Sequence, residues 1–264
     1  MSLLLSVDWE VRIGGATLEV RRRAARLSRA GVGVERSVHR VACVAAPWDA
    51  MLAALDGCME AELPARRALR RRARVILPDC LVRYAVLPWN PALAGRAEEQ
   101  AYLRHRFGQL YDNDTAGWHM RVEPGHGRTR LASAVEPALV ESLGSLMAAR
   151  GIALDALVPA LADTVNRERA RLAHPNGWLA CHDSGCLCLA GWHGWQWTSA
   201  RSFRAGPHWE AALPSLLARE ECLHDGAGPA DIVYLEDRDG NAGGGPLPGW
   251  HTERLGAARD EVAS

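Results

Sequence analysis

Two spacings of apolar residues alternate along the first part of the chain. Short apolar runs at 3–7 (LLLSV) and 38–45 (VHRVACVA) are typical of β-strands. In the segment that follows, the apolar residues recur every three or four positions, as on one face of a helix: Trp48, Met51, Leu52, Leu55 and Met59. The runs RVIL (74–77) and LVRYAVL (81–87) predict two further strands joined by a Pro-Asp turn.

The middle of the chain predicts three helices and a hairpin. Asn90 and Pro91 have the side chains that favour a helix start, and the apolar face of that helix would carry Leu103, Phe107 and Leu110. The segments WHMRV (118–122) and RLASAV (130–135) flank a Pro-Gly-His-Gly turn, so they predict a hairpin. Further helices are predicted from Pro137 to a stop at Gly151, and over 160–172.

The order of elements then repeats. Apolar runs at 178–182, 186–191 and 195–200 predict three strands, followed by a helix near 207–221 and a strand at 231–235. We interpret the segment between 3 and 77 in the same order, three strands, a helix and a strand, with the runs at 3–7 and 38–45 as two of its first three strands. This repeat predicts an α/β protein of two related lobes with mixed sheets flanked by helices. The first lobe would span 1–158, with a subdomain inserted at about 78–130, and a shortened second lobe would span 159–264.

Charge and composition narrow the chemistry. The 264 residues carry no net charge, and all 31 basic side chains are arginine, so a Walker A lysine and a Schiff-base lysine are both absent from this sequence. The first 74 residues hold 14 arginines against 8 acids. Such a basic segment can contact phosphate or an anionic membrane, or simply form a solvated face. No aromatic residues interleave with the arginine runs, which argues against binding of single-stranded nucleic acid.

The apolar runs and the cysteines indicate the compartment. No apolar run approaches the roughly 18 residues that cross a bilayer, and the first ten residues do not form a signal peptide. Seven cysteines, an odd number in a chain of this size, suit reduced thiols. We therefore expect a cytoplasmic protein.

The stretch CHDSGCLCLAGW (181–192) holds three of those cysteines and a His-Asp pair. The spacing of Cys181, Cys186 and Cys188 does not match the close ligand pairs of zinc sites, so we expect small apolar side chains packed in a sheet. A hydrolytic triad is not indicated, because no GxSxG motif occurs and His182 and Asp183 would point to opposite faces of a strand. A strand, an Asp-Ser-Gly turn and a second strand remain.

This hairpin resembles one found in actin-like ATPases, whose ribonuclease-H-like lobes each open with a hairpin that offers backbone amides to phosphates. The segment HDSGCLCLAG (182–191) looks like the second such hairpin, and SVDWEVRIGG (6–15) like the first. The order of RVILPDCLVRYAVLPW (74–89), EEQAYLRHRFGQLY (98–111) and the segment at 130–167 is similar to the type IV pilus platform protein PilM and the cytoplasmic part of the type II secretion protein GspL. The likeness covers roughly residues 70–235.

The resemblance implies candidate nucleotide-binding residues, which are Asp8, Asp183, Ser184, Gly185, Gly243, Gly244 and Gly245. These loops depart from the pattern of nucleotide-binding members. Trp9 and Glu10 crowd the first loop, and Cys186 follows the second where a small or hydroxyl residue is expected. The resemblance therefore implies degenerate loops and a protein without catalytic residues.

Tryptophan and acidic residues supply two further candidate groups. The four tryptophans near the third strand of the second lobe would either line a partner groove or fill the space between sheet and helix: Trp192, Trp195, Trp197 and Trp209. Two segments imitate calcium loops, one at 112–123 and one that begins at Asp237 and Asp239. Their later positions do not fit the template, so we expect no metal site and, from Asp237 onward, a poorly packed tail before Trp250.

The resemblance implies two alternative functions, and the arginine-rich segments indicate a third. The first is a non-enzymatic cytosolic scaffold of a pilus or secretion platform that binds an inner-membrane partner in a cleft between the lobes, is peripheral to the membrane through that partner, and can form a homodimer. The second is an ATP-binding switch with magnesium. The third is an arginine-driven nucleic-acid-binding protein.

Overall fold

A computed structural model describes the chain except for residues 1–2, 15, 29–30, 43–47, 63–69, 94, 112–114, 116, 184, 207, 224–229, 240–246 and 257–264. The chain divides into two compact units. The first comprises Met1–Pro78 and Glu136–Asp163, and the second comprises Asp79–Val135 and Thr164–Ser264.

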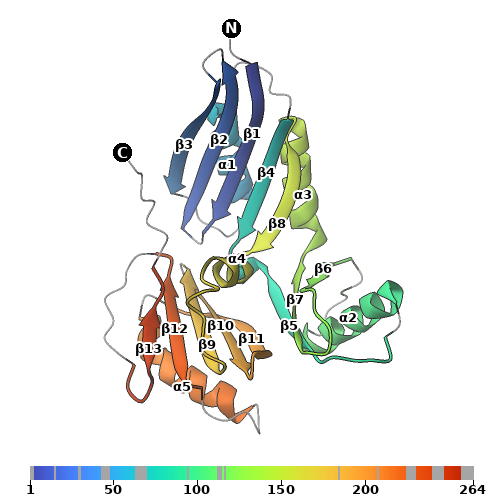
Figure 1. The fold of residues 1–264 in the computed structure, drawn as a ribbon, viewed down its shortest axis with the longest axis vertical. Coiled ribbons are helices and arrows are strands. Elements are labelled where there is room, and N and C mark those ends of the chain that lie inside the picture. The colour runs from blue at the N-terminus through green and yellow to red at the C-terminus, as the bar shows by residue number, and fades with distance from the viewer. Residues whose placement is uncertain are drawn as a thin grey trace. The chain divides into compact units, whose positions relative to one another are not determined.

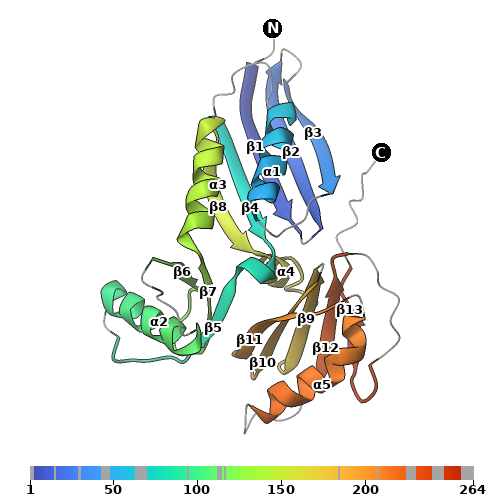
Figure 2. The ribbon, with the colours of Figure 1, turned by 180° about the vertical axis from the view of Figure 1, so that it is seen from behind.

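The first unit is built on one five-stranded sheet. Its strands are, in chain order, β1 (Leu3–Ile13), β2 (Thr17–Ser28), β3 (Gly31–Ala42), β4 (Arg70–Leu77) and β8 (Ala153–Pro159). In space the order is β3-β2-β1-β4-β8, with β1, β2 and β3 antiparallel and β1, β4 and β8 parallel. The helices α1 (Trp48–Glu62) and α3 (Pro137–Ala149) both cover one face of this sheet (Figures 1 and 2).

The alternation of residues along β1 explains that arrangement. Val7, Trp9 and Val11 are buried, whereas Asp8 between them is exposed. Because successive side chains of a strand point to opposite faces, the apolar set lies under the helices and the polar set lies on the other face. At the far edge, β3 is exposed along most of its length and carries Val32, the most exposed of its valines, at 64%.

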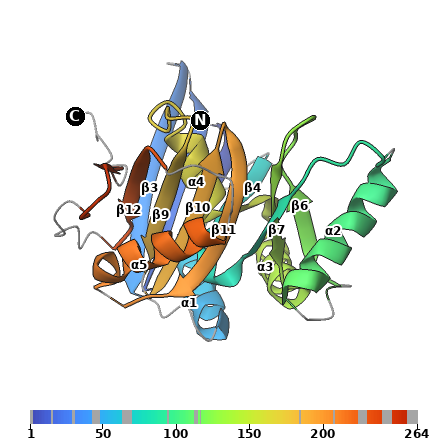
Figure 3. The ribbon, with the colours of Figure 1, turned by 90° about the horizontal axis from the view of Figure 1, so that it is seen from below.

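The second unit contains a sheet with the same topology. Its strands are β9 (Gly177–Asp183), β10 (Cys186–His193), β11 (Gln196–Arg204), β12 (Ile232–Asp237) and β13 (Thr252–Arg254). Their spatial order β11-β10-β9-β12-β13 repeats the first sheet strand for strand, with the same parallel and antiparallel neighbours. The helix α5 (Trp209–Cys222) packs on one face through an apolar core that includes Leu187, Leu213 and Val233 (Figure 3). The predicted two-lobed α/β repeat is confirmed.

Two pairs of tryptophan and glycine interlock in this sheet. Trp178 on β9 lies directly across from Gly191 on β10, and Trp192 lies across from Gly177. A Cβ atom built on Gly191 would lie 2.6 Å from the Trp178 ring, and one on Gly177 would lie 2.7 Å from the Trp192 ring. Each indole therefore occupies the space that a side chain on the opposing strand would need.

A three-stranded sheet completes the second unit. It consists of β5 (Arg83–Leu87), β6 (His119–Val122) and β7 (Arg130–Val135) in the order β5-β7-β6, and it follows the short 3-10 helix η1 (Asp79–Leu81). The helix α2 (Arg96–Tyr111) packs on it through Leu103 and Phe107 (Figure 3). The predicted hairpin of β6 and β7 is confirmed.

Two helix boundaries differ from the prediction. The helix expected to start at Asn90 begins at Arg96, because the Asn90 side chain accepts a hydrogen bond from the Ala92 amide (3.0 Å) and closes a local turn instead. The helix expected over 160–172 is α4 (Ala160–Arg167), and the chain then continues in turns around Glu168. Of the tail predicted to pack poorly before Trp250, residues 240–246 lie outside the described residues, but Leu247 is buried in the core under α5.

Candidate functional site

The hairpin between β9 and β10 has the predicted tight turn. Asp183 ends β9 and is directly opposite Cys186, so two residues form the loop, and Gly185 adopts a φ of +88°. That left-handed conformation favours glycine. Asp183 is buried, with 7% of its surface exposed. Ser184 lies outside the described residues, as do Gly243, Gly244 and Gly245 of the predicted adenosine loop.

Asp8 does not lie at the equivalent turn of the first sheet, which corrects our placement of it there. It occupies the middle of β1, in register with Arg23 on β2 and Arg72 on β4, whereas the turn to β2 follows Ile13. Its neighbours on both sides are therefore arginine-bearing strands and not the backbone amides of a loop.

The cysteines of the second hairpin are packed in the sheet, as predicted. Cys181, Cys186 and Cys188 are buried and form no disulfide. Burial raises the pKa of the Cys181 and Cys188 thiols well above the ordinary value, so both stay protonated. Cys80 on η1 is exposed, and a hydrogen bond from the Cys186 thiol lowers the pKa of Cys80.

The four tryptophans predicted to contact a partner occupy different environments. Trp209 is 3% exposed in the core under α5, and Trp192 is 8% exposed, where its indole N–H donates to the carbonyl of residue 174. Trp197 is partly buried and donates to Glu123 (3.1 Å). Trp195 has a φ of +63° in the turn between β10 and β11, and it is 55% exposed. Of the four, Trp195 presents the largest share of its surface to a partner.

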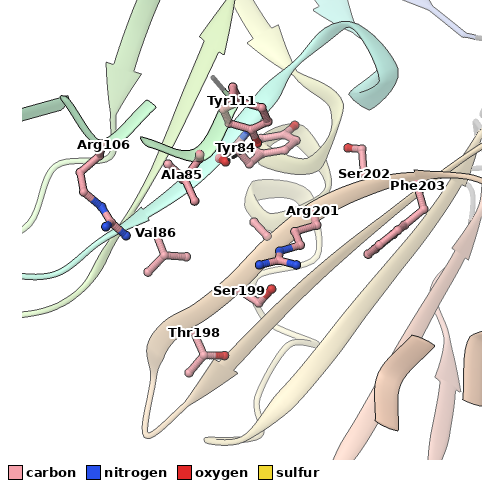
Figure 4. A pocket seen from close by; sticks show the side chains of 12 residues that line it. Tyr84, Ala85, Val86, Arg106, Tyr111, Thr198, Ser199, Arg201, Ser202 and Phe203 are labelled. Carbon is pink, nitrogen blue, oxygen red and sulfur yellow. Dashed lines mark hydrogen bonds between the residues drawn. The ribbon is translucent and has the colours of Figure 1, made fainter. Parts of the chain in front are cut away.

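A groove of about 450 Å³ opens within the second unit, between β5 and α2 on one side and β11 on the other (Figure 4). That volume falls within the range typical of ligand sites. Twelve residues line it: Tyr84, Ala85, Val86, Arg106, Leu110, Tyr111, Thr198, Ser199, Ala200, Arg201, Ser202 and Phe203. Its walls are edge strands, since β5 ends the three-stranded sheet and β11 ends the five-stranded sheet.

The tyrosines of the groove show how one of these edges is satisfied. The Tyr111 hydroxyl accepts a hydrogen bond from the Tyr84 amide (3.1 Å) and donates one to the Tyr84 carbonyl (2.6 Å). It thus takes the place that a neighbouring strand would occupy at this residue of β5. The Tyr84 hydroxyl points elsewhere and donates to buried Asp79 (2.5 Å), and burial followed by the Asp79 charge raises its pKa well above 10.

The groove is basic. Its lining contains Arg106 and Arg201 and no acidic side chain. Arg201 lies 3.5 Å from buried Glu220, and Arg106 donates to Gln109 (3.3 Å) while its Nε is buried without a hydrogen-bond partner among the described residues. Apolar surface from Val86, Leu110 and Phe203 adjoins these cations. This combination suits a ligand with both apolar and anionic groups.

Sequence patterns did not indicate this groove. Leu110 was predicted on the buried face of its helix, but 46% of its surface is exposed and it lines the groove. The segment TSARSF (198–203) has no clean alternation of polar and apolar residues, and no local pattern shows that β5 lies beside it.

The arginine-bearing strands of the first sheet are interleaved with acids. Arg12 and Arg74 bind Asp163 (2.6 and 2.7 Å), and Arg74 also binds Glu10 (3.2 Å). Arg40 similarly pairs with Glu19 (2.6 Å) across β2 and β3. Acidic neighbours at these positions reduce the positive potential that phosphate binding requires, which argues against the nucleic-acid hypothesis.

A buried ionic network joins three segments of the second unit. Arg238, just after β12, donates to Asp79 on η1, to Glu236 on β12 and to Thr164 on α4, each at 2.9 Å. Arg167 also pairs with Glu236. Burial alone would raise the pKa of Glu236, but Arg238, Arg167 and the Thr164 hydroxyl together lower it below the ordinary 4.5. The network therefore holds η1 and the end of α4 against β12 with charged hydrogen bonds.

Solved structures with the same architecture identify the fold. The cytoplasmic domain of EpsL, an inner membrane component of the type II secretion system of Vibrio cholerae, matches 95% of this chain and 90% of its own, with a TM-score of 0.54 and 14% identity. A chain of the PilM–PilN type IV pilus biogenesis complex matches 94% of this chain and 88% of its own, with a TM-score of 0.59 and 14% identity.

A Bacteroides thetaiotaomicron protein with an actin-like ATPase fold and unknown function matches 87% of this chain and 81% of its own, with a TM-score of 0.54 and 10% identity. The chain therefore has the actin-like fold that the sequence predicted, and it resembles PilM and GspL in structure. No protein-family model and no curated protein matches it by sequence. Within the described residues, no helix is long and apolar enough to span a bilayer.

Proposed function

We propose that this protein is a non-enzymatic scaffold of a bacterial type IV pilus or type II secretion assembly platform. In this role it binds a short segment of a membrane-anchored partner and is held at the inner membrane by it. The observation that carries the proposal is a fold shared along almost the whole chain with the EpsL cytoplasmic domain and with the PilM–PilN complex. One of these proteins is an inner membrane component of a secretion system, and the other is part of a two-protein complex.

We assign the binding of that segment to the groove between β5 and β11. The edge strand β11 can offer backbone N–H and C=O groups to an added strand, whereas Tyr111 already bonds the backbone of β5 at Tyr84, and side chains along the groove then supply specificity. The groove lies within one compact unit, so both of its walls belong to the same body. The expected ligand is an extended segment with apolar side chains for Phe203 and Leu110 and an acidic side chain for Arg106 or Arg201.

The test is affinity capture of the tagged protein from detergent-solubilised membranes of its own host, with bound proteins identified by mass spectrometry. Arg106→Glu removes one groove cation and repels an acidic ligand, so we expect at least a tenfold loss of the captured partner. Arg104→Glu is the matched control, because this exposed arginine lies on the same helix and does not line the groove.

Recovery of a membrane-anchored pilus or secretion component by the unmodified protein and by Arg104→Glu, but not by Arg106→Glu, supports both parts of the proposal. Equal recovery by Arg106→Glu would show that the partner binds elsewhere. If the unmodified protein captures no platform component, the scaffold role itself is wrong. The cleft expected between the lobes concerns how the two units are placed, and it stays a prediction, as does the homodimer.

A second function, an ATP-binding switch, is favoured by one observation. The turn at Gly185 follows Asp183 directly and has the left-handed backbone of a tight phosphate-binding hairpin. Calorimetry with ATP and magnesium distinguishes the two functions. A Kd for ATP below about 100 μM, equivalent to a binding free energy of about −5.5 kcal/mol, would favour the switch. If ATP produces no heat of binding, the scaffold function is favoured.

A further inference from the structure

His182, Asp237 and Asp239 meet where β9 and β12 end. The two strands are parallel neighbours, and His182 and Asp237 are directly opposite each other in register. The His182 Nδ1 atom lies 3.4 Å from Asp237 Oδ1 and 3.5 Å from Asp239 Oδ2. One nitrogen and two carboxylate oxygens thus face one another, all within 4.8 Å. From the sequence we expected no metal site at Asp237 and Asp239, and no local pattern connects these residues with His182.

The spacing of these atoms is longer than a normal hydrogen bond. N–H···O bonds in proteins have donor-to-acceptor distances of about 2.7–3.2 Å. A tetrahedral zinc ion with bonds of about 2.0–2.1 Å to nitrogen and oxygen holds its ligand atoms about 3.3–3.4 Å apart. The two nitrogen-to-oxygen separations are 3.4 and 3.5 Å, close to such an edge, and the two carboxylate oxygens lie within 4.8 Å of each other.

The environment of His182 holds its ring in place. The residue is only 2% exposed, and its ring stacks on Trp209 with centroids 5.2 Å apart. Its Nε2 atom has no hydrogen-bond partner among the residues that the structure describes. The polar contacts of this buried ring are therefore two long ones at Nδ1. A metal bound at Nδ1 would replace these two contacts with direct bonds, and the ring proton would then lie on Nε2.

The charge of the cluster and its exposure to solvent are also compatible with a bound zinc ion. Two carboxylates balance a divalent cation, and a nitrogen donor favours zinc over magnesium or calcium, which prefer oxygen ligands alone. The Asp239 amide donates to Asp237 Oδ1 (3.1 Å) and so orients that carboxylate. The Asp239 side chain keeps 20% of its surface exposed, which gives the ion a route in. Arg238, between the two acids, instead donates to Asp79, Glu236 and Thr164.

From this geometry we propose that His182, Asp237 and Asp239 form a Zn²⁺ site with three protein ligands and a fourth position open to water. Three protein ligands with one open position is an arrangement known for zinc. The ion would join the carboxyl ends of β9 and β12 beside the Asp183 turn. The proposal does not depend on the scaffold function, and neither test decides the other.

The experiment is zinc titration of the full-length metal-free protein by calorimetry, followed by the absorption spectrum of the cobalt(II)-loaded protein. We expect one zinc ion per chain and a cobalt spectrum of a tetrahedral site with nitrogen and oxygen ligands. Asp239→Asn should weaken zinc binding at least about tenfold, since it replaces a ligating carboxylate at a partly exposed position that tolerates change. Asp231→Asn is the control, because this exposed aspartate of the same unit lies outside the cluster.

His182→Gln tests the nitrogen ligand and should also lose binding, but the buried ring contributes to packing, so the partly exposed Asp239 provides the decisive variant. Zinc binding that is absent from the unmodified protein, or equally strong in Asp239→Asn, overturns the proposal. A thiolate-to-cobalt charge-transfer band would overturn it as well, because it would assign the metal to cysteine. Loss in Asp239→Asn together with retention in Asp231→Asn supports the site.

Discussion

Replacing Arg238 with methionine tests whether the buried ionic network determines the stability of the second unit. Methionine keeps most of the apolar stem and removes the guanidinium, which donates three hydrogen bonds of 2.9 Å. Each hydrogen bond to a charged partner contributes about 1.5–3 kcal/mol. The full sum is not expected, because Asp79 keeps the Tyr84 hydroxyl and Glu236 keeps Arg167 and Thr164. Removing one member of a buried ion pair typically costs about 3–5 kcal/mol, and we expect that loss here.

Arg171→Met is the matched control. Arg171 of the same unit also has several partners, namely Glu253 (2.8 Å), Glu168 (3.4 Å) and the Arg254 carbonyl (2.8 Å), but its side chain is 42% exposed and that of Glu253 is 38% exposed. Exposed pairs of this kind contribute about 0–1 kcal/mol. Both substitutions remove the same group, so the difference between them isolates the effect of burial.

The assay is urea denaturation followed by hydrogen-exchange mass spectrometry, because a chain with two compact units need not unfold in one step. In Arg238→Met, amides of β9 and β12 should exchange faster, while those of β1 and β2 in the first unit should not change. Adding Asp79→Asn to Arg238→Met should recover part of the loss, since it removes a buried charge that has lost its cation. A loss below about 1 kcal/mol, equal to that of Arg171→Met, would refute the reasoning.

Three further predictions concern the second unit. Gly191→Ala should cost about 1–3 kcal/mol in urea denaturation, because the new methyl group would overlap the Trp178 ring, whereas Gly108→Ala, with open space around it in α2, should be neutral or stabilising. Because the folded pKa of Glu236 is below its unfolded 4.5, its contribution to stability should be complete above about pH 4.5 and should decline as the pH falls through the folded pKa; Glu236→Gln should remove that part of the acid sensitivity, and an unchanged pH profile would contradict it. Exposed Cys80 should react with a thiol reagent in the native protein, while Cys188 should react only after unfolding, and peptide mapping of the labelled sites checks both; early labelling of Cys188 would contradict its burial.

The second half of the repeat of three strands, a helix and a strand, together with β1, α1 and β4 of the first half, could be predicted because these elements have their own apolar spacing. The strand β2 (Thr17–Ser28) has no apolar run and was not predicted individually, and β3 (Gly31–Ala42) was expected only from Val38 onward. In α1 the predicted face buries Met51, Leu55 and Met59 completely. The strands β9 and β10 are buried at almost every position, which explains why they are continuous apolar runs. By contrast β13 (Thr252–Arg254) has no apolar residue, and it is a strand only because β12 lies beside it.

The candidate sites could not be predicted because they depend on contacts between residues that are far apart in the sequence. Asp8 resembles a phosphate-loop aspartate in its local sequence, but the length of β1 places the turn after Ile13, and no local pattern states where a strand ends. The His182 cluster likewise depends on the register between β9 and β12, whose residues are 55 positions apart. The apolar pattern of a single element predicts which of its faces is buried, but it does not predict which other element packs against that face.

The contrast between strands of the second sheet indicates where a partner can bind without a large conformational cost. The strands β9 and β10 are buried at almost every position, so they form a rigid centre whose side chains do not line the groove. The strand β11 hydrogen-bonds to this centre along one edge, while several of its side chains are exposed and its other edge faces the groove. A segment added at β11 would therefore meet a preorganised edge, which reduces the ordering entropy that binding must overcome.

The two Gly–Trp pairs stiffen β9 and β10 behind that edge, so a substitution such as Gly177→Ala should weaken partner binding only to the extent that it loosens the sheet. If Gly177→Ala leaves hydrogen exchange in β11 unchanged and still abolishes capture of the partner, preorganisation of the edge is not the reason that the segment binds there.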